Sequence, residues 1–168
     1  MGVLSTTPTV ASAQAKSTAK KSTTTAKPAA KPASKATTAA AKEQLPDGKQ
    51  VYATTCAACH QATGEGVSGV FPPLAGSEWV TGDDAKLVRI VLHGVTGPIE
   101  VAGETFNGMM PGWGTTLKDP DIAAVLTYVR GTWGNKGTPI TAASVAKIRA
   151  ATSSRTTPWT APELAAVK

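Results

Sequence analysis

The stretch Cys56-Ala57-Ala58-Cys59-His60 decides how this chain of 168 residues is interpreted. Two cysteines three positions apart, with a histidine directly after the second, form the CxxCH pattern through which c-type haem is attached. On a helical turn, the two thiols have the spacing of the two porphyrin vinyl groups, and the imidazole is carried under the iron. The segment therefore predicts one covalent haem c, held through thioethers to Cys56 and Cys59, with His60 as an iron ligand.

Two other chemistries also use closely spaced cysteines. A zinc site needs four ligands, and His93 is the one additional nitrogen donor of this kind in the chain. A thioredoxin-like dithiol would lie within a βαβ pattern, which the surrounding sequence lacks. A structural disulfide framework is excluded, because the chain has only two cysteines. Haem attachment is therefore favoured over zinc and over a redox dithiol.

A second axial ligand is expected from Met110, which follows His60 by fifty residues. Pro111 biases Met110 toward an extended conformation, and the surrounding glycines allow the backbone to approach a porphyrin closely. Met109 is the competing candidate and is interpreted as a packing residue. His93 would give a bis-His haem, but its place at the end of an amphipathic segment indicates a packing or surface role.

The positive charge of the chain is concentrated near its N-terminus. Residues 1–42 hold seven of the 17 Lys and Arg and no acid, which leaves 10 basic against 11 acidic residues in 43–168. The Ala, Lys, Thr and Pro composition of residues 1–44 predicts a disordered tail. We interpret this tail as a solvated spacer, with electrostatic association with a membrane or an acidic partner as the alternative. A near-neutral domain argues against nucleic-acid binding.

The segment Ala11-Ser12-Ala13-Gln14-Ala15 resembles the cleavage region of a signal peptide. We therefore interpret the start of the tail as the remnant of an export signal. The sequence contains no run of 18 or more apolar residues, so it predicts no transmembrane helix.

Capping residues and apolar periodicity predict a mostly helical domain over residues 45–134. The expected elements are a helix from about Gly48 to Cys59 with Asp47 as N-cap, a loop over 63–76, a helix that begins at a capping box of Thr81 and Asp84 and ends at Gly94, a short hairpin over 99–106, a loop over 107–116, and a helix capped by Asp119 that ends at Gly131 or Gly134. Residues 135–168 are expected to form an extension that packs on the domain through Trp159 and Leu164, with a helix over 141–150 and a turn opened by Thr160 and Glu163. Such short helices make a weak core, which a covalent haem would stabilise.

The order of four segments resembles the class I cytochromes c: 56–60, 72–76, 107–111 and 122–130. The segments 93–99 and 106–113 are further similar to cytochrome domains found with bacterial periplasmic dehydrogenases and respiratory complexes. The resemblance implies an all-α fold of three to four helices around one covalent haem, with a short β-hairpin before the Met loop. It also implies that this domain ends near residue 134.

The resemblance further implies roles for individual residues. The Pro72 carbonyl would accept the Nδ1 proton of His60, so that Nε2 faces iron. The first and last helices would cross at Gly48 and Tyr128, with Tyr52 as a less certain participant. Other residues expected near the haem or at its exposed edge are Trp79, Arg89 and Trp113 at the propionates or edge, Asn107 near the Met110 sulfur, and Val67, Val70, Phe71 and Met109 in an exposed apolar ring. Core packing for the two tryptophans and a solvated helix face for Arg89 are the alternatives.

The function implied is one-electron transfer by a monohaem protein with His60 and Met110 as axial ligands. The chain would be an electron carrier rather than an enzyme, either free or as a subunit of a respiratory or dehydrogenase complex. Its partners would be redox proteins, with a dehydrogenase or quinol-oxidising complex as donor and an oxidase or other protein as acceptor. A haem peroxidase is the alternative, but it usually needs a second haem or an open iron position. Haem attachment in this family implies a periplasmic location or the outer face of the cytoplasmic membrane.

Overall fold

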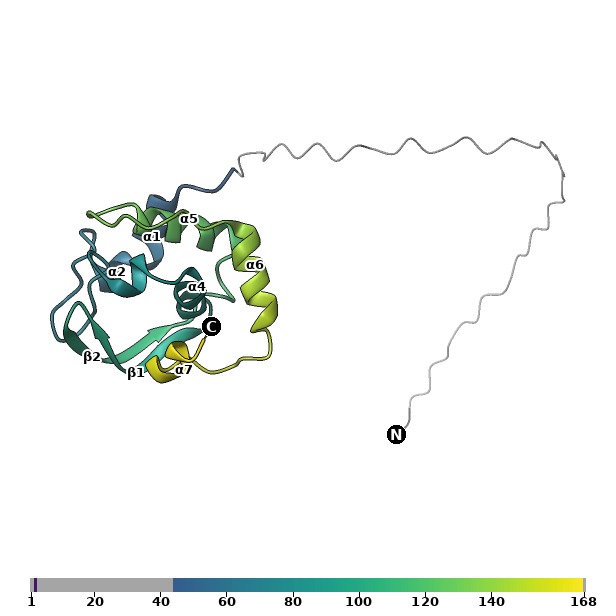
Figure 1. Cartoon of the computed structure of the whole chain (residues 1–168). Coiled ribbons are helices and arrows are strands. Elements are labelled where there is room, and N and C mark those ends of the chain that lie inside the picture. The colour runs from purple at the N-terminus through teal and green to yellow at the C-terminus, as the bar shows by residue number, and fades with distance from the viewer. Residues whose placement is uncertain (1, 3–43, 168) are drawn as a thin grey trace. The chain divides into compact units, whose positions relative to one another are not determined.

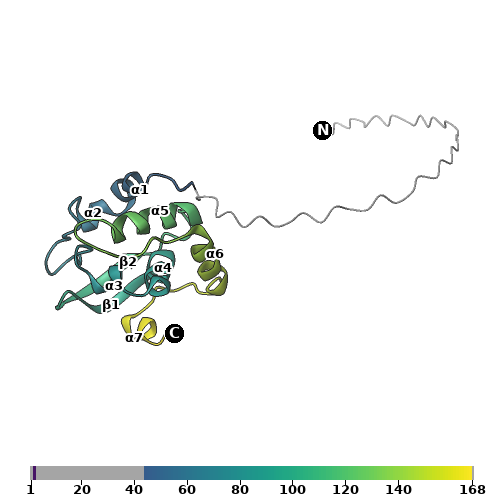
Figure 2. The same cartoon turned by 45° about the horizontal axis from the view of Figure 1, so that its top comes forward.

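A computed structural model describes Gly2 and residues 44–167 of the chain. The elements are α1 (Gly48–Thr55), α2 (Ala57–His60), α3 (Glu78–Thr81), α4 (Asp84–His93), β1 (Gly94–Val101), β2 (Glu104–Pro111), α5 (Asp119–Arg130), α6 (Ala142–Ala151) and α7 (Ala161–Ala165). Figures 1 and 2 show α1 and α5 together on one side of the domain and the β1–β2 hairpin on the other, with α4 between them. The predicted tail lies almost entirely outside the described residues. No helix within those residues is both long and apolar enough to cross a lipid bilayer.

The first and last helices of the predicted domain cross at Gly48, as expected. A Cβ atom at this position would lie 2.2 Å from the Ala124 carbonyl oxygen on α5, so only glycine allows this approach. Tyr52 on α1 and Tyr128 on α5 extend the contact, with ring centroids 5.7 Å apart. Trp133 completes the aromatic group, with its ring centroid 5.1 Å from that of Tyr52. The structure therefore confirms the crossing, including the participation of Tyr52.

The helix expected over residues 48–59 is instead two helices that meet at Cys56. Its N-cap is Asp47 as predicted, because the Asp47 carboxylate accepts the Lys49 and Gln50 amide protons. The last turn of α1 carries Thr54 and Thr55, whose hydroxyls donate to carbonyls of the preceding turn. Such back-bonding weakens and bends a helix, which explains the interruption before α2.

Two other predicted helix starts are wrong in detail. The N-cap of α4 is Asp83, whose carboxylate accepts the Ala85 amide proton at 2.7 Å, whereas Thr81 ends the preceding helix. The N-cap of α5 is Lys118 rather than Asp119, and the Asp121 carboxylate accepts the Lys118 amide proton. At α4, Asp83 and Asp84 follow one another, and either can supply a cap. At α5, the N-cap residue is a lysine and the bond comes from Asp121 three positions later, so the nearest acid does not mark the cap.

The hairpin is longer than predicted and contains residues 107–111, which were expected to form a loop. The two strands pair antiparallel around a turn at Ala102 and Gly103, which both have positive φ as a type I′ turn requires. Met110 lies opposite Val95 in this register. Glycines and prolines occur in both strands and lower their apparent strand propensity, which explains the missed length.

Two groups of buried side chains form the core. The larger one joins α1, α3, α4, α5 and α6, and the smaller one joins α4, the hairpin and α7. The apolar faces expected on α4 and α5 are buried, including Leu87, Ile90 and Val91, and Ile122, Val125, Leu126 and Val129.

Arg130 is an unexpected charged member of the core. It is only 3% exposed and forms an ion pair of 2.7 Å with Asp84. Its guanidinium also donates to the carbonyls of Val80, Gly82 and Thr138. Because α5 ends at this side chain, these bonds hold α3, the start of α4 and the chain after α5 together.

Residues 135–167 contact the helices and the hairpin through residues on α6, on α7 and on the segment between them. Arg149 on α6 forms an ion pair with Asp119 and donates to the carbonyls of Gly114 and Leu117. Trp159 pairs with the free edge of β1, because its amide donates to Gly94 and its carbonyl accepts the Thr96 amide proton. Leu164 on α7 is fully buried in the smaller group.

Candidate functional site

The predicted attachment residues lie on one wall of an internal cavity. Cys56 and Cys59 flank the first residues of α2, and both thiols are free and partly buried. Burial is the main cause that raises the pKa of the Cys56 thiol. The His60 side chain ends α2 and is only 8% exposed. The fold therefore brings both thiols and the imidazole to the same cavity.

The orientation of His60 is fixed by the loop that follows it. Its Nδ1 lies 2.9 Å from the carbonyl oxygen of Pro72. A carbonyl can only accept, so Nδ1 carries the proton and Nε2 keeps its lone pair. Burial lowers the pKa of His60 and outweighs the bond to Pro72, which raises it, so the net effect favours the neutral imidazole that a metal needs. This contact is the one expected for the proline.

Short-range and long-range bonds position Pro72. The Gly66 amide donates to the His60 carbonyl, and the Leu74 and Ala75 amides donate to the Gly64 carbonyl. The buried side chain of Asn135 accepts the Gly76 amide proton and donates to the carbonyls of Leu74 and Val129. Sequence reasoning missed Asn135, because an Asn just after a helix is an ordinary loop residue until its distant partners are known.

A second wall of the cavity carries Met110. This side chain is partly buried and packs against both groups of core residues. Adjacent side chains in a strand point to opposite faces, and the neighbouring Met109 is 71% exposed. Both methionines border the cavity, but only Met110 also packs into the core. The geometry favours Met110 as the thioether that faces a bound group.

The cavity has a volume of about 380 Å³ and a mostly apolar lining, as cofactor sites usually have. It lies between the two groups of core residues, and its lining comes from α2, the 63–76 loop, α4, the hairpin and α5. The predicted site residues that line it are Cys56, Cys59, His60, Pro72, Trp79, Asn107, Met110 and Trp113.

Arg89 differs from the other predicted site residues, because it does not line the cavity in the described part of the chain. Its guanidinium donates to the Ala85 carbonyl and lies 6.0 Å from the ring centre of Trp159, on the side of the extension. Trp79 lines the cavity, and its indole N–H donates a hydrogen bond of 2.8 Å to the Glu100 carbonyl. The haem contacts expected for these two side chains stay predictions.

His93 is also separate from the cavity lining. Its Nε2 lies 2.7 Å from the Thr152 hydroxyl, which itself donates to the Ile148 carbonyl. The hydroxyl proton is therefore used, so Nε2 of His93 is the donor. This arrangement matches the packing role expected for His93. Within the described residues, no three His, Cys, Asp or Glu side chains gather as a metal site of another kind.

Comparison with known proteins agrees with this site. The family model for cytochrome c matches residues 45–133. Cytochrome c-552 of Thermus thermophilus is 43% identical over 113 residues, which cover 62% of this chain and 85% of the relative. The cytochrome c subunit of a quinone alcohol dehydrogenase from Gluconacetobacter polyoxogenes is 42% identical over 106 residues, covering 61% of this chain and 22% of that subunit. The cbb3-type cytochrome c oxidase subunit CcoP of an Azospirillum species is 36% identical over 105 residues, which cover 58% of this chain and 32% of that subunit.

This chain belongs to the cytochrome c family, because the family model matches more than half of its length. The predicted class I cytochrome c fold is confirmed, with helices around the cavity and one small hairpin. The family carries covalently bound haem c with iron. The residues present fit that group, since two thiols and a neutral imidazole lie on one wall of an apolar cavity and a thioether lies on another. Electron transfer is the function that the family and these relatives support.

Proposed function

We propose that this protein transfers one electron at a time through a single haem c with His60 and Met110 as axial ligands. When bound, the haem supplies an iron that changes between the ferric and ferrous states. The observation that carries the proposal is the cavity itself, which brings the His60 imidazole and the Met110 thioether together from different elements.

Each part of the site has a distinct role in this proposal. Cys56 and Cys59 hold the porphyrin covalently, so that the cofactor stays in place during electron transfer. The Pro72 carbonyl fixes the tautomer and the ring orientation of His60 through the bond of 2.9 Å. Met110 favours ferrous iron, and the apolar lining excludes water, so both raise the reduction potential. With two protein ligands in place, iron would keep no open position for a substrate, which supports a carrier rather than an enzyme.

The partners that we propose are redox proteins. Relatives with similar sequence are named as the cytochrome subunits of a quinone alcohol dehydrogenase, a gluconate 2-dehydrogenase and a cbb3-type oxidase. We therefore propose a dehydrogenase or quinol-oxidising complex as donor and an oxidase or another redox protein as acceptor. The proposed location is the periplasm or the outer face of the cytoplasmic membrane, where such partners would be met.

A matched pair of substitutions tests the axial ligand. Met110→Leu and Met109→Leu each replace one thioether by an aliphatic side chain of similar volume. We expect Met110→Leu to abolish the weak charge-transfer band of ferric Met–iron haem and to lower the reduction potential, since the ferrous state loses its soft ligand. Met109→Leu should leave both unchanged. Survival of the band in Met110→Leu would overturn the ligand assignment.

A fractionation experiment separates a free carrier from a subunit. The full chain is expressed behind an added cleavable export signal, and the distribution of haem c is followed through osmotic release, membrane washing and gel filtration. Release as a monomer supports the carrier. Retention with a dehydrogenase or oxidase activity supports the subunit.

A further inference from the structure

Four large apolar side chains are exposed in the described part of the chain, three on the 63–76 loop and one on β2. They are Val67, Val70, Phe71 and Met109, with exposed fractions of 40%, 57%, 36% and 71%. Val67 and Phe71 are held together by a pair of backbone hydrogen bonds of 2.8 Å. Val70, Phe71 and Met109 also line the cavity. We call these four residues the apolar patch, which borders the predicted haem site through Val70, Phe71 and Met109.

Four carboxylates lie on the segments that carry or neighbour the apolar patch. We call Glu65, Glu78, Glu100 and Glu104 the acidic rim, and all four residues are exposed. Glu104 is tied directly to the patch loop, because one carboxylate oxygen accepts the Ser68 hydroxyl proton at 3.0 Å and the Gly69 amide proton at 2.9 Å.

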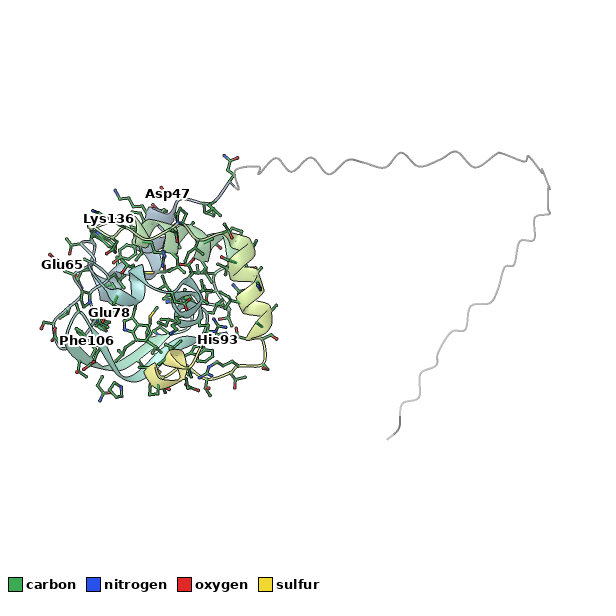
Figure 3. All side chains as sticks on the ribbon, in the orientation of Figure 1. Asp47, Glu65, Glu78, His93, Phe106 and Lys136 are labelled. Carbon is green, nitrogen blue, oxygen red and sulfur yellow. The ribbon has the colours of Figure 1, made fainter. Side chains whose placement is uncertain are left out.

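The other members of the acidic rim lie close to the same hairpin end or loop. Glu78 accepts the Ala102 amide proton at the hairpin turn, and Glu100 pairs with Thr105 beside that turn. Figure 3 shows Glu65, Glu78 and Phe106 toward one end of the domain and His93 away from them. The rim is therefore a local feature rather than a scatter of acids over the surface.

No basic side chain neutralises the acidic rim within the described residues. The three ion pairs found there join Arg130 to Asp84, Arg149 to Asp119 and Arg155 to Glu163. The segments 61–85 and 94–117, which contain the patch and the hairpin, have no Lys or Arg. Lys136, which Figure 3 shows between Asp47 and Glu65, forms none of these ion pairs. The rim carboxylates thus face solvent without an ion-pair partner among the described residues.

We infer that the apolar patch and the acidic rim form the docking surface for a redox protein with an apolar centre surrounded by Lys and Arg. This inference rests on the proposed function and names the partner chemistry for its site. Apolar contact would bring the two cofactors close, and charge complementarity would orient the encounter and raise its rate at low ionic strength. The chain as a whole carries a net charge of +6 from its tail, which would favour the opposite kind of partner.

Oxidation by small redox complexes of opposite charge shows whether the local charge of the acidic rim or the net charge of the chain controls the encounter. The reduced full-length protein is mixed with tris(1,10-phenanthroline)cobalt(III), which takes one electron and becomes cobalt(II), or with hexacyanoferrate(III), which takes one electron and becomes hexacyanoferrate(II). The inference predicts that added salt slows oxidation by the cobalt cation and speeds oxidation by the anion. The net charge predicts the reverse for both probes, and that result would overturn the inference.

A charge-matched pair of variants locates the effect. Glu100→Gln/Glu104→Gln removes two rim charges, and the amide oxygen of Gln can still accept the Ser68 and Gly69 protons. Ala143→Lys/Ala146→Lys changes the net charge by the same amount on exposed positions of α6. We expect the rim variant to slow the cobalt reaction roughly tenfold at low ionic strength, from Coulomb's law at about 10 Å. The α6 variant should stay within about twofold. Equal effects in both variants would contradict the docking surface.

A binding measurement completes the test without electron transfer. Hexaamminechromium(III) is a paramagnetic cation that exchanges no electron under these conditions, and hexacyanochromate(III) is its anionic counterpart. We expect the cation to broaden the amide signals of Gly69, Ala102 and their neighbours in the reduced protein, and the anion to leave them sharp. Broadening elsewhere would overturn the inference. If neither the cobalt nor the iron complex oxidised the protein at all, the proposed function would fail instead.

Discussion

Tyr52 shows how one side chain can act on the attachment segment from outside the cavity. It is 2% exposed, and its hydroxyl donates to the Gln61 carbonyl at 2.6 Å. Gln61 directly follows His60 and has a positive φ of 62°, which is strained for a residue other than glycine. The bond from Tyr52 therefore helps to hold the chain in this conformation just after the imidazole.

Tyr52→Phe is expected to destabilise the protein by about 1 kcal/mol, because it leaves the Gln61 carbonyl without this partner. The free energy of unfolding in guanidinium chloride measures the effect. Tyr128→Phe is the matched control, since it removes the same atom from the same aromatic group and keeps the Tyr52 bond. Equal losses in the two variants would show that the bond to Gln61 contributes nothing specific.

His93 makes the stability depend on pH in a defined direction. Burial, followed by the guanidinium groups of Arg155, Arg149 and Arg89, holds the pKa of His93 below its ordinary value of 6.5. Between that value and the folded pKa, the unfolded chain binds more protons than the folded one. The stability contributed by the neutral imidazole is therefore full above 6.5 and is lost as the pH falls through this range.

His93→Gln should flatten this part of the pH dependence, because Gln can reach the Thr152 hydroxyl but does not titrate in the range. The free energy of unfolding is measured for both proteins between about pH 8 and pH 5, the range in which an ordinary histidine titrates. The wild type is expected to lose stability relative to the variant as the pH falls. Parallel curves would count against this assignment.

At the scale of elements, β1 is the strand that connects the thioether wall to the extension. Its residue Val95 lies opposite Met110 on one side and forms a parallel bridge with Trp159 on the other. On α7, Leu164 is 0% exposed and belongs to the smaller group of buried side chains, together with Val95 and Phe106. Met110 packs against this same group. The extension therefore supports the strand pair that positions Met110.

Leu164→Ala should cost about 2–4 kcal/mol of stability, as for other large buried aliphatic side chains. It should also make Met110 easier to displace, which is measured as tighter binding of added imidazole to the ferric protein. Val167→Ala is the control, since Val167 is only partly buried on the same segment. A stability loss without any change in imidazole binding would mean that α7 supports the core but not the Met110 strand.

The elements also show where sequence reasoning succeeded and where it failed. The Gly48 crossing, the buried faces of α4 and α5 and the Pro72–His60 bond were predictable, because local spacing or a family motif determines each of them. The long hairpin, the Asn135 bonds and the Trp159 bridge were not. Their partners lie 9 to 17 residues away in the missed part of the hairpin, 61 residues away for Asn135 with Leu74, and 64 residues away for Trp159 with Val95. No local pattern of capping or periodicity reports such partners.

At the scale of the whole molecule, the cavity lies where a core would otherwise be continuous. Leaving about 380 Å³ unfilled would cost up to roughly 9 kcal/mol at about 24 cal/mol per Å³, with water entry reducing that figure. This is comparable to the entire stability of an ordinary domain, about 5–15 kcal/mol. The cofactor is therefore a structural part of the core as well as the redox group.

Cys56→Ser/Cys59→Ser, which prevents covalent attachment, is expected to abolish cooperative folding once haem dissociates. Circular dichroism melts and the dispersion of amide signals measure this outcome. Cys56→Ser alone keeps one thiol and should give a protein of intermediate stability that retains its haem. A sharp cooperative melt of the haem-free double variant would show that the chain can close the cavity without its cofactor.

The Trp159 bridge has a consequence for the order in which the protein matures. Trp159 follows His60 by 99 residues, and a ribosome makes the attachment segment long before it makes this residue. Until Trp159 arrives, the outer edge of β1 lacks its partner strand. The imidazole side of the site can thus be completed early, whereas the thioether side waits for Trp159. Proteolytic removal of the segment that contains Trp159 would return the molecule to that earlier stage, with haem attached and the edge of β1 unpaired.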